Sequence, residues 1–157
     1  MELRSPALGE WFPLRYVYRG YGCTGDNLSP PLEWRGEPPG TQSFAITMHD
    51  PDAPHPGGWW HWIVFDIPST LHSLPEGAGP WLRELGAVES VTTFGEPGYG
   101  GPCPPVGHGP HRYYITVWAL PVAKAPLTVD TPPEQAARWI EGHALDSATI
   151  MARFERS

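Results

Sequence analysis

Positive charge is scarce in this chain of 157 residues, which has ten Lys and Arg side chains against seventeen Asp and Glu. Lys124 is its one lysine. A nucleic-acid groove and a docking face for anionic membranes both need a basic surface, so neither function is expected. With a formal net charge of −7, the protein must hold any bound anion by local chemistry rather than by its overall field.

The chain also lacks a long apolar run. No stretch approaches the length of a membrane-spanning helix, and residues 1–6 have no apolar segment like that of a signal peptide. We therefore expect no stable membrane insertion and, by default, a cytoplasmic location. No repeat or linker divides the chain, and 40% of its residues are hydrophobic. These features predict a single folded domain over residues 1–157.

Cysteine is rare, with only Cys23 and Cys103. The two do not form a CxxC-type metal pair. A cytoplasmic location favours two reduced thiols. The alternative is a disulfide, which would close a long loop and stabilise the fold by about 4 kcal/mol in the chain-entropy model.

Proline and glycine are abundant, with 21 and 18 residues spread along the chain. This pattern is typical of short strands joined by rigid turns. Residues 43–49 alternate so that apolar side chains share one face, and residues 60–67 are apolar on both faces, as in a fully buried strand. Residues 112–120 are rich in β-branched and aromatic side chains and also predict a strand. Shorter strands are expected near residues 14–19, 32–35 and 90–94.

Helices are expected only at the C-terminus. Thr131 to Glu134 has the spacing of a capping box, followed by an apolar stripe that ends near Gly142. A second helix is expected to begin at Asp146. Strands first and helices last predict a mainly β fold, an antiparallel sandwich of two sheets with short C-terminal helices.

Two loops are unusual. One covers residues 50–59, and the other covers residues 95–110, where eleven of sixteen residues are Gly or Pro. A long loop without secondary structure inside a compact domain is usually functional or disordered. Because strong strands flank residues 95–110 and prolines stiffen them, we expect an ordered loop that forms one wall of a site.

Polar side chains occupy the strand ends beside these loops. Asp50 follows one strand, His61 opens the next, and His111 and Tyr113 share one face at the start of a third. Protonated imidazoles and a phenol are hydrogen-bond donors, and a nearby carboxylate raises a histidine pKa. If the strand ends meet, they form a pocket for a phosphate or carboxylate group. Binding should then weaken as the pH rises through the histidine pKa.

Four sequence motifs follow one another along the chain. They are Asn-Leu-Ser-Pro-Pro-Leu-Glu-Trp at residues 27–34, Asp-Pro-Asp-Ala-Pro at 50–54, Gly-Trp-Trp-His-Trp at 58–62, and Gly-Pro-Cys-Pro-Pro at 101–105 followed by His-Arg-Tyr at 111–113. Together they resemble the phosphatidylethanolamine-binding protein family, also called Raf kinase inhibitor-like proteins, in its bacterial and archaeal branch. The resemblance runs from about residue 14 to the C-terminal helix.

The resemblance implies a two-sheet antiparallel sandwich with a small cavity for phosphate, phosphorylated headgroups such as phosphoethanolamine, or acetate. It also implies a cis bond at Asp50–Pro51 and, less strongly, at Gly57–Gly58. It suggests a binding or regulatory protein that modulates a kinase or another partner, and a homodimer. The eukaryotic C-terminal helix that covers the cavity has no match here, which argues against kinase inhibition. The ligand-binding residues that the motifs imply are Asp50, Asp52, Trp59, His61, Cys103, Pro104, Pro105, His111 and Tyr113.

Two enzymatic alternatives remain open. A metal-dependent hydrolase could use Asp50, His61 and His111 as ligands, although the close ligand pair of a motif such as HExxH is missing. A hydrolase could instead use Cys103 as a nucleophile activated by His108 or His111, although the flanking prolines leave few backbone N–H groups for an oxyanion hole. The sequence therefore favours a binding protein without a cofactor over an enzyme, and it assigns no role to His108.

Overall fold

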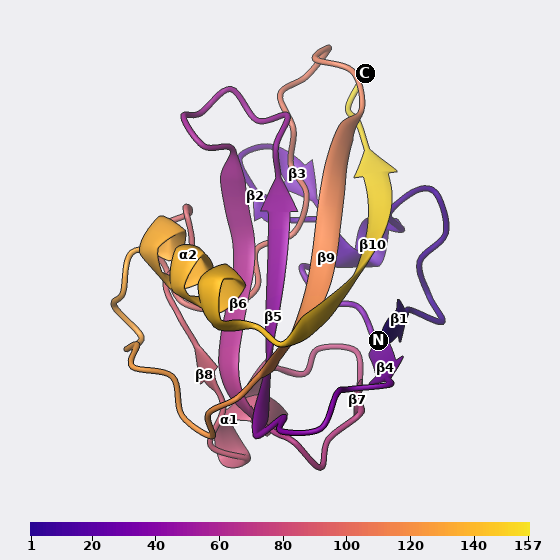
Figure 1. The fold of residues 1–157 in the computed structure, drawn as a ribbon. Coiled ribbons are helices and arrows are strands. Elements are labelled where there is room, and N and C mark those ends of the chain that lie inside the picture. Colours follow the sequence, from indigo (N-terminus) through magenta and orange to yellow (C-terminus); the bar gives the residue numbers. More distant parts are fainter.

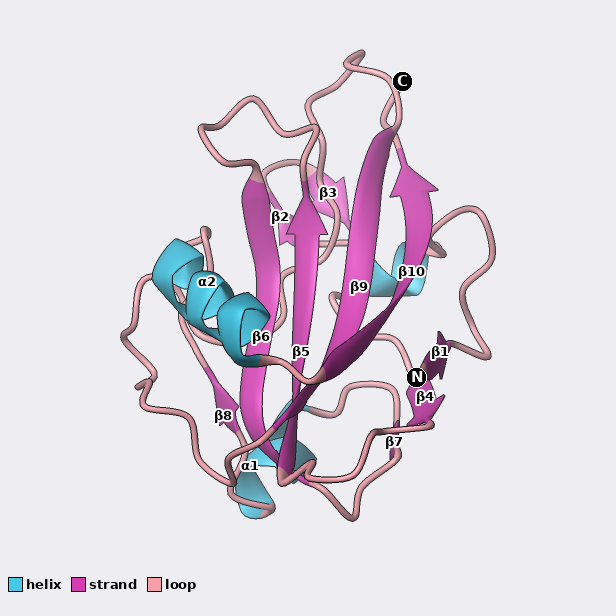
Figure 2. Ribbon diagram, in the orientation of Figure 1, coloured by secondary structure: helices cyan, strands magenta, loops and turns pink.

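The computed structural model describes all residues, 1–157, and is built mainly of antiparallel strands. Figure 2 shows that strands form the body of the molecule and that the helices lie at its periphery. The elements are β1 (Glu2–Arg4), the 3₁₀ helix η1 (Leu14–Tyr16), β2 (Arg19–Gly20), β3 (Cys23–Thr24), β4 (Leu32–Arg35), β5 (Ser43–Asp50), β6 (Trp59–Pro68), β7 (Ser73–Leu74), α1 (Gly79–Glu84), β8 (Val88–Glu89), β9 (His111–Leu120), α2 (Pro133–His143) and β10 (Asp146–Phe154).

The largest sheet has five strands in the order β10-β9-β5-β6-β8, and each pair of adjacent strands is antiparallel. A three-stranded sheet, β1-β4-β7, and a two-stranded ribbon, β2-β3, complete the strand structure. The expected mainly β antiparallel fold is thus confirmed, and the three long strands predicted from the sequence appear as β5, β6 and β9. The short strand predicted at residues 32–35 is β4.

Side-chain alternation decides how the sheets pack. Phe44, Ile46 and Met48 of β5 all lie in the larger core, which the five-stranded and three-stranded sheets share. The strand β6 is buried on both faces, as predicted, because Trp62 faces this core while Ile63 belongs to the smaller core beneath α2. Figure 1 shows α2 lying against the outer face of β6.

The expectation of a second C-terminal helix is wrong. Residues from Asp146 to Phe154 form the strand β10, whose nine residues pair with β9 along its whole length. This pairing satisfies the backbone groups on the outer edge of β9, which a helix would leave open. Helices are also not confined to the C-terminus, because α1 lies between β7 and β8.

Other predicted elements change in length or type. The strand expected near residues 14–19 is the 3₁₀ helix η1 followed by the short β2, and the one expected near 90–94 is reduced to β8 just before it. The C-terminal helix exists as α2, but no side chain caps its first turn. None of the helices is both long and apolar enough to cross a membrane.

The expected cis bonds are also wrong, since the chain contains none. At Asp50–Pro51 the chain turns by another means, because the Asp50 side chain accepts a hydrogen bond from the Asp52 backbone N–H at 2.8 Å. Such an Asx turn reverses the backbone locally. At Gly57 and Gly58 the turn comes from positive φ angles of 79° and 77°, which glycine adopts without steric cost.

One end of the five-stranded sheet collects the loops. β5 and β10 end there, and β6 and β9 begin there, so that Asp50 pairs with Trp59 and His111 pairs with Phe154. Figure 1 shows the two unusual loops, the β2-β3 ribbon and the C-terminus gathered at this end. The expectation that three strand ends meet beside the glycine- and proline-rich loop is therefore confirmed.

Candidate functional site

A cavity of about 260 Å³ opens at this end of the sheet. It lies where the ends of β5, β6 and β9 meet the loop of residues 95–110, which supplies one wall as expected. Its lining residues are Tyr21, Asp50, Ala53, Pro54, His55, Trp59, His61, Phe94, Cys103, Pro104, Pro105, His111, Tyr113 and Arg156.

Eight of the nine residues singled out from the sequence line this cavity, and Asp52 is the exception. Its carboxylate points to Arg112, which donates three hydrogen bonds of 2.8 to 2.9 Å to it through Nε, Nη2 and the backbone N–H. These bonds lower the pKa of Asp52 to about 2. Asp52 therefore lies outside the cavity and holds the N-terminal end of β9 in place through Arg112.

Asp50 and His111 form a buried pair in the cavity wall. His111 Nδ1 lies 2.6 Å from Asp50 Oδ2, and both side chains are almost fully buried. Burial raises the pKa of Asp50, and the hydrogen bond from His111 opposes that rise. Because a carboxylate holds the Nδ1 proton, the pair fixes the ring orientation and tautomer of His111.

His61 is neutral at ordinary pH, contrary to the expectation that both imidazoles carry a proton for an anion. Burial is the main cause, and it lowers the pKa of His61 to about 4. Its Nδ1 lies 2.7 Å from the Gly100 carbonyl oxygen, and a carbonyl only accepts, so Nδ1 carries the proton. In this tautomer Nε2 is an acceptor, and it makes no hydrogen bond within the chain.

Two buried donors at the cavity have no partner. They are the hydroxyl of Tyr113 and the indole Nε1–H of Trp59. Burial raises the pKa of Tyr113, so its hydroxyl stays protonated. Buried polar groups are almost always hydrogen-bonded, and an orphaned one costs about 1–3 kcal/mol. Three other buried polar atoms, in Trp34, Trp60 and Ser90, also lack a partner, but only Tyr113 and Trp59 belong to residues that line this cavity.

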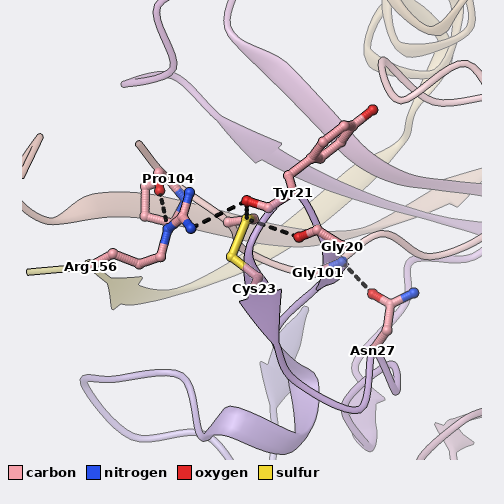
Figure 3. The surroundings of a disulfide bond; sticks show 8 residues. Gly20, Tyr21, Cys23, Asn27, Gly101, Pro104 and Arg156 are labelled. Carbon is pink, nitrogen blue, oxygen red and sulfur yellow. Dashed lines mark hydrogen bonds between the residues drawn. A yellow bond between two sulfur atoms is a disulfide. The ribbon is translucent and has the colours of Figure 1, made fainter. Parts of the chain in front are cut away.

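Arg156 is the one Lys or Arg side chain in the cavity lining. Its Nε donates to the Pro104 carbonyl at 2.6 Å and its Nη1 to the Tyr21 carbonyl at 3.3 Å. Figure 3 shows the guanidinium held between these two segments. Arg156 was not among the predicted site residues because a helix was expected in this region, whereas β10 runs beside β9 and brings the C-terminus to His111.

A disulfide joins Cys23 and Cys103, so the expectation of two reduced thiols is wrong. It ties the β2-β3 ribbon to the loop of residues 95–110, next to the Tyr21 and Pro104 carbonyls that hold Arg156 (Figure 3). The two cysteines lie 80 positions apart and meet only because the fold brings the ribbon under this loop. Disulfides persist mainly in oxidising compartments, so the cytoplasmic location stays a prediction without support from the cysteines.

Aromatic side chains form part of the cavity lining. Phe94 meets Trp59 and His61 edge-on, with both ring centroids at 5.3 Å, and stacks on Tyr18 at 4.4 Å. The exposed Tyr21 stacks against Tyr18 at 5.5 Å. The cavity therefore combines a few polar groups with an apolar wall, as ligand sites commonly do. No sequence motif marked Phe94 or Tyr21.

A wider hollow of about 740 Å³ lies over the three-stranded sheet. Its charged side chains are already matched in ion pairs, Arg4 with Glu33 and Arg35 with Glu2. These pairs are exposed and contribute little binding energy. The smaller cavity is therefore the candidate binding site.

Neither enzymatic alternative finds support in this geometry. No group of three or more His, Cys, Asp or Glu side chains lies close enough to hold a metal ion, so Asp50, His61 and His111 do not form the ligand set that the first alternative requires. The Cys103 nucleophile is contradicted directly, because its sulfur is bonded to Cys23 and no thiol is available.

Comparison with known proteins gives a consistent result. The family described as "Phosphatidylethanolamine-binding protein" matches residues 4–155. Among curated proteins, YbcL of Escherichia coli is 41% identical over 150 residues, covering 94% of this chain and 82% of YbcL. YbhB of the same organism is 40% identical over 148 residues, covering 93% of each chain. Both carry the name UPF0098 protein.

Solved structures agree with the sequences. The crystal structure of E. coli YbcL, described as a new member of the mammalian PEBP family, has a TM-score of 0.94 at 39% identity and covers 99% of this chain and 98% of its own. A PEBP homologue from Chlamydia trachomatis has a TM-score of 0.81 at 33% identity and covers 99% of this chain and 97% of its own.

Proposed function

Since the chain belongs to the phosphatidylethanolamine-binding protein family, in its bacterial and archaeal UPF0098 branch, we propose that it is a binding protein for small phosphate-bearing anions and not an enzyme. One observation carries the proposal. The unpartnered donors of Tyr113 and Trp59 belong to residues that line the same cavity as Arg156. Oxygen atoms of a phosphate group would satisfy both donors and the positive charge together.

The neutral His61 further restricts which anions can bind in the cavity. Its free Nε2 is an acceptor, which repels a fully deprotonated oxyanion but accepts a hydrogen bond from a P–OH group. A phosphate or phosphomonoester that keeps one proton presents both kinds of atom. Inorganic phosphate meets this requirement near neutral pH because it keeps at least one proton, whereas phosphoethanolamine, a phosphomonoester with a second pKa of about 6, meets it only in mildly acidic solution. Sulfate, which has no proton to donate, does not meet it.

Replacing Arg156 by Gln should weaken phosphate binding about thirtyfold, because a hydrogen bond to a charged group is worth about 2 kcal/mol. Calorimetric titration with inorganic phosphate and phosphoethanolamine measures the change. In the unaltered protein, phosphate at about 100 times its dissociation constant should add about 3 kcal/mol of stability.

Arg153→Gln is the matched control, because Arg153 belongs to the same strand end but pairs with Glu10, away from the cavity. It should bind phosphate as the unaltered protein does, and sulfate should bind more weakly than phosphate to both. Equal phosphate affinity in the Arg156→Gln and Arg153→Gln variants would show that the anion site lies elsewhere.

Replacing Tyr113 by Phe should change stability and binding in opposite directions. Losing an unsatisfied buried hydroxyl should raise the free energy of unfolding of the unliganded protein by about 1 kcal/mol, while phosphate affinity falls about tenfold. Tyr99→Phe is the control, because the Tyr99 hydroxyl is satisfied by the Tyr16 carbonyl at 2.7 Å and lies outside the cavity lining. That variant should lose stability and keep its affinity. A destabilised Tyr113→Phe variant with unchanged phosphate affinity would contradict the proposal.

The proposal also covers the regulatory role, the cellular location and the oligomeric state of the protein. Family membership implies a ligand-binding or regulatory role, and regulation of a kinase or another protein partner is the regulatory form that we propose. We also propose a cytoplasmic location and a homodimer. The tryptophans add little support for a dimer, because only Trp11 of the eight is strongly exposed, at 45%.

A further inference from the structure

His108 extends the buried pair of Asp50 and His111 into a row of three side chains. His108 Nδ1 lies 2.6 Å from His111 Nε2, and His111 Nδ1 lies 2.6 Å from Asp50 Oδ2. His108 itself is exposed and does not line the cavity. The row therefore leads from a buried carboxylate to an imidazole on the surface.

When His108 and His111 are both neutral, the proton positions in this row follow from its hydrogen bonds. Asp50 accepts the Nδ1 proton of His111, so a neutral His111 has a lone pair on Nε2. That lone pair accepts the Nδ1 proton of His108. The remaining nitrogen of His108, Nε2, then carries a lone pair and has no hydrogen-bond partner in the chain.

This is the arrangement of an activated nucleophile. A nucleophile within hydrogen-bond reach of a base, which a third group orients, is the general pattern of covalent catalysis. In the serine triad an aspartate holds one nitrogen of a histidine whose other nitrogen takes the nucleophile's proton. Here Asp50 and His111 occupy those two places, and an imidazole stands where the serine hydroxyl would be.

The backbone holds His108 in this position. The loop before β9 is pinned by a hydrogen bond from the Gly107 N–H to the Arg156 carbonyl at 2.9 Å, and the His108 N–H donates to the Pro105 carbonyl at 3.2 Å. Gly107 and Gly109 on either side have positive φ angles of 76° and 82°. The imidazole is therefore presented by an anchored turn.

We propose that His108 is a phosphoryl acceptor, a site of covalent modification that goes beyond anion binding. Its Nε2 lone pair forms a bond to the phosphorus of an acyl phosphate. The bond from phosphorus to the acyl oxygen breaks, and the carboxylate leaves with that electron pair. The Nδ1 proton of His108 passes to His111 Nε2, and Asp50 stabilises the imidazolium. The products are Nε2-phosphohistidine and the free carboxylate, and no oxidant or reductant is needed.

His143 provides an internal comparison. It is also exposed, and its Nδ1 donates to the Trp139 carbonyl at 2.7 Å, which leaves its Nε2 free as in His108. A carbonyl cannot take up the proton, so His143 lacks the base that His108 has. His143 also differs in lying at the end of α2 with its ring stacked on Trp139 at 4.3 Å. The proposal predicts that His108 reacts and His143 does not.

The test is to incubate the full chain with acetyl phosphate and follow intact mass over time. We expect one added phosphoryl group that is lost in acid and stable in base, and fragmentation should place it on His108 and not on His143. The His108→Asn variant should remain unmodified. In the His111→Asn variant the rate should fall by about 10²-fold or more, the usual contribution of a general base.

Modification of His143 at the rate of His108, or no modification at all, would overturn the proposal without recourse to any variant. An unchanged rate in a folded His111→Asn protein would also overturn it. The phosphate-dependent rise in thermal stability is measured separately on the unaltered protein. A protein that binds phosphate but is not phosphorylated at His108 thus refutes this inference and leaves the binding proposal standing.

Discussion

Replacing Cys23 and Cys103 together by serine should lower the free energy of unfolding by about 4 kcal/mol. The disulfide joins residues 80 positions apart, and in the chain-entropy model so long a loop gains much freedom in the unfolded state once the bond is lost. For a domain of this size the melting temperature should fall by about 10 °C. Urea unfolding of the oxidised protein and the double variant measures the difference.

The same change should weaken phosphate binding. The disulfide fixes two segments beside the Tyr21 and Pro104 carbonyls that orient Arg156, so its loss should leave the guanidinium less well placed. A dithiol reductant added to the unaltered protein should reproduce both losses, and the same reductant should leave the double variant unchanged. A double variant as stable as the oxidised protein would show that the bond contributes nothing to the native fold.

Acid should destabilise the protein between pH 6.5 and about pH 4, because of His61. Burial lowers its pKa from 6.5 to about 4 in the folded state. Below pH 6.5 the unfolded chain binds a proton at this residue and the folded chain does not, so the stability present above pH 6.5 is lost as the pH falls. A shift of this size corresponds to about 3 kcal/mol once the pH is below both pKa values. Unfolding free energies measured from pH 7.5 to pH 4 test this.

The His61→Asn variant should lose most of this pH dependence, since an asparagine amide can still donate to the Gly100 carbonyl but does not titrate. His143→Asn, at an exposed position, should retain it. The pair of Asp52 and Arg112 acts in a different window, because the pKa of Asp52 is lowered to about 2 and its contribution is lost only below about pH 4. If His61→Asn and the unaltered protein lose stability equally between pH 6.5 and 4, His61 is not the group responsible.

The strands were predictable because their signal is local. Alternation of Phe44, Ile46 and Met48, and the double-sided apolar run around Trp62, follow from the two-residue period of a strand whatever lies next to it. The site was predictable to the extent that it sits at strand ends. Asp50 and His111 were found because each directly adjoins a strongly patterned strand.

What failed depended on pairing between distant parts of the chain. The residues from Asp146 to Phe154 read as a helix when taken alone, and they become β10 because β9 offers an open edge. That error also hid Arg156. Asp52 was predicted to line the cavity because it belongs to the same motif as Asp50. In the structure its side chain instead accepts hydrogen bonds from Arg112 outside the cavity.

The sequence by itself determined the mainly β fold and the strand ends that hold most of the cavity, since both depend on residue type and short-range spacing. The tertiary structure decided the rest. It brought Cys23 to Cys103, carried Arg156 to the cavity, set His108 against His111, and buried His61 deeply enough to keep it neutral. The physical reason is the same in each case. A long-range contact and the desolvation of a side chain both depend on which residues the fold places around it, and these are not its neighbours in the sequence.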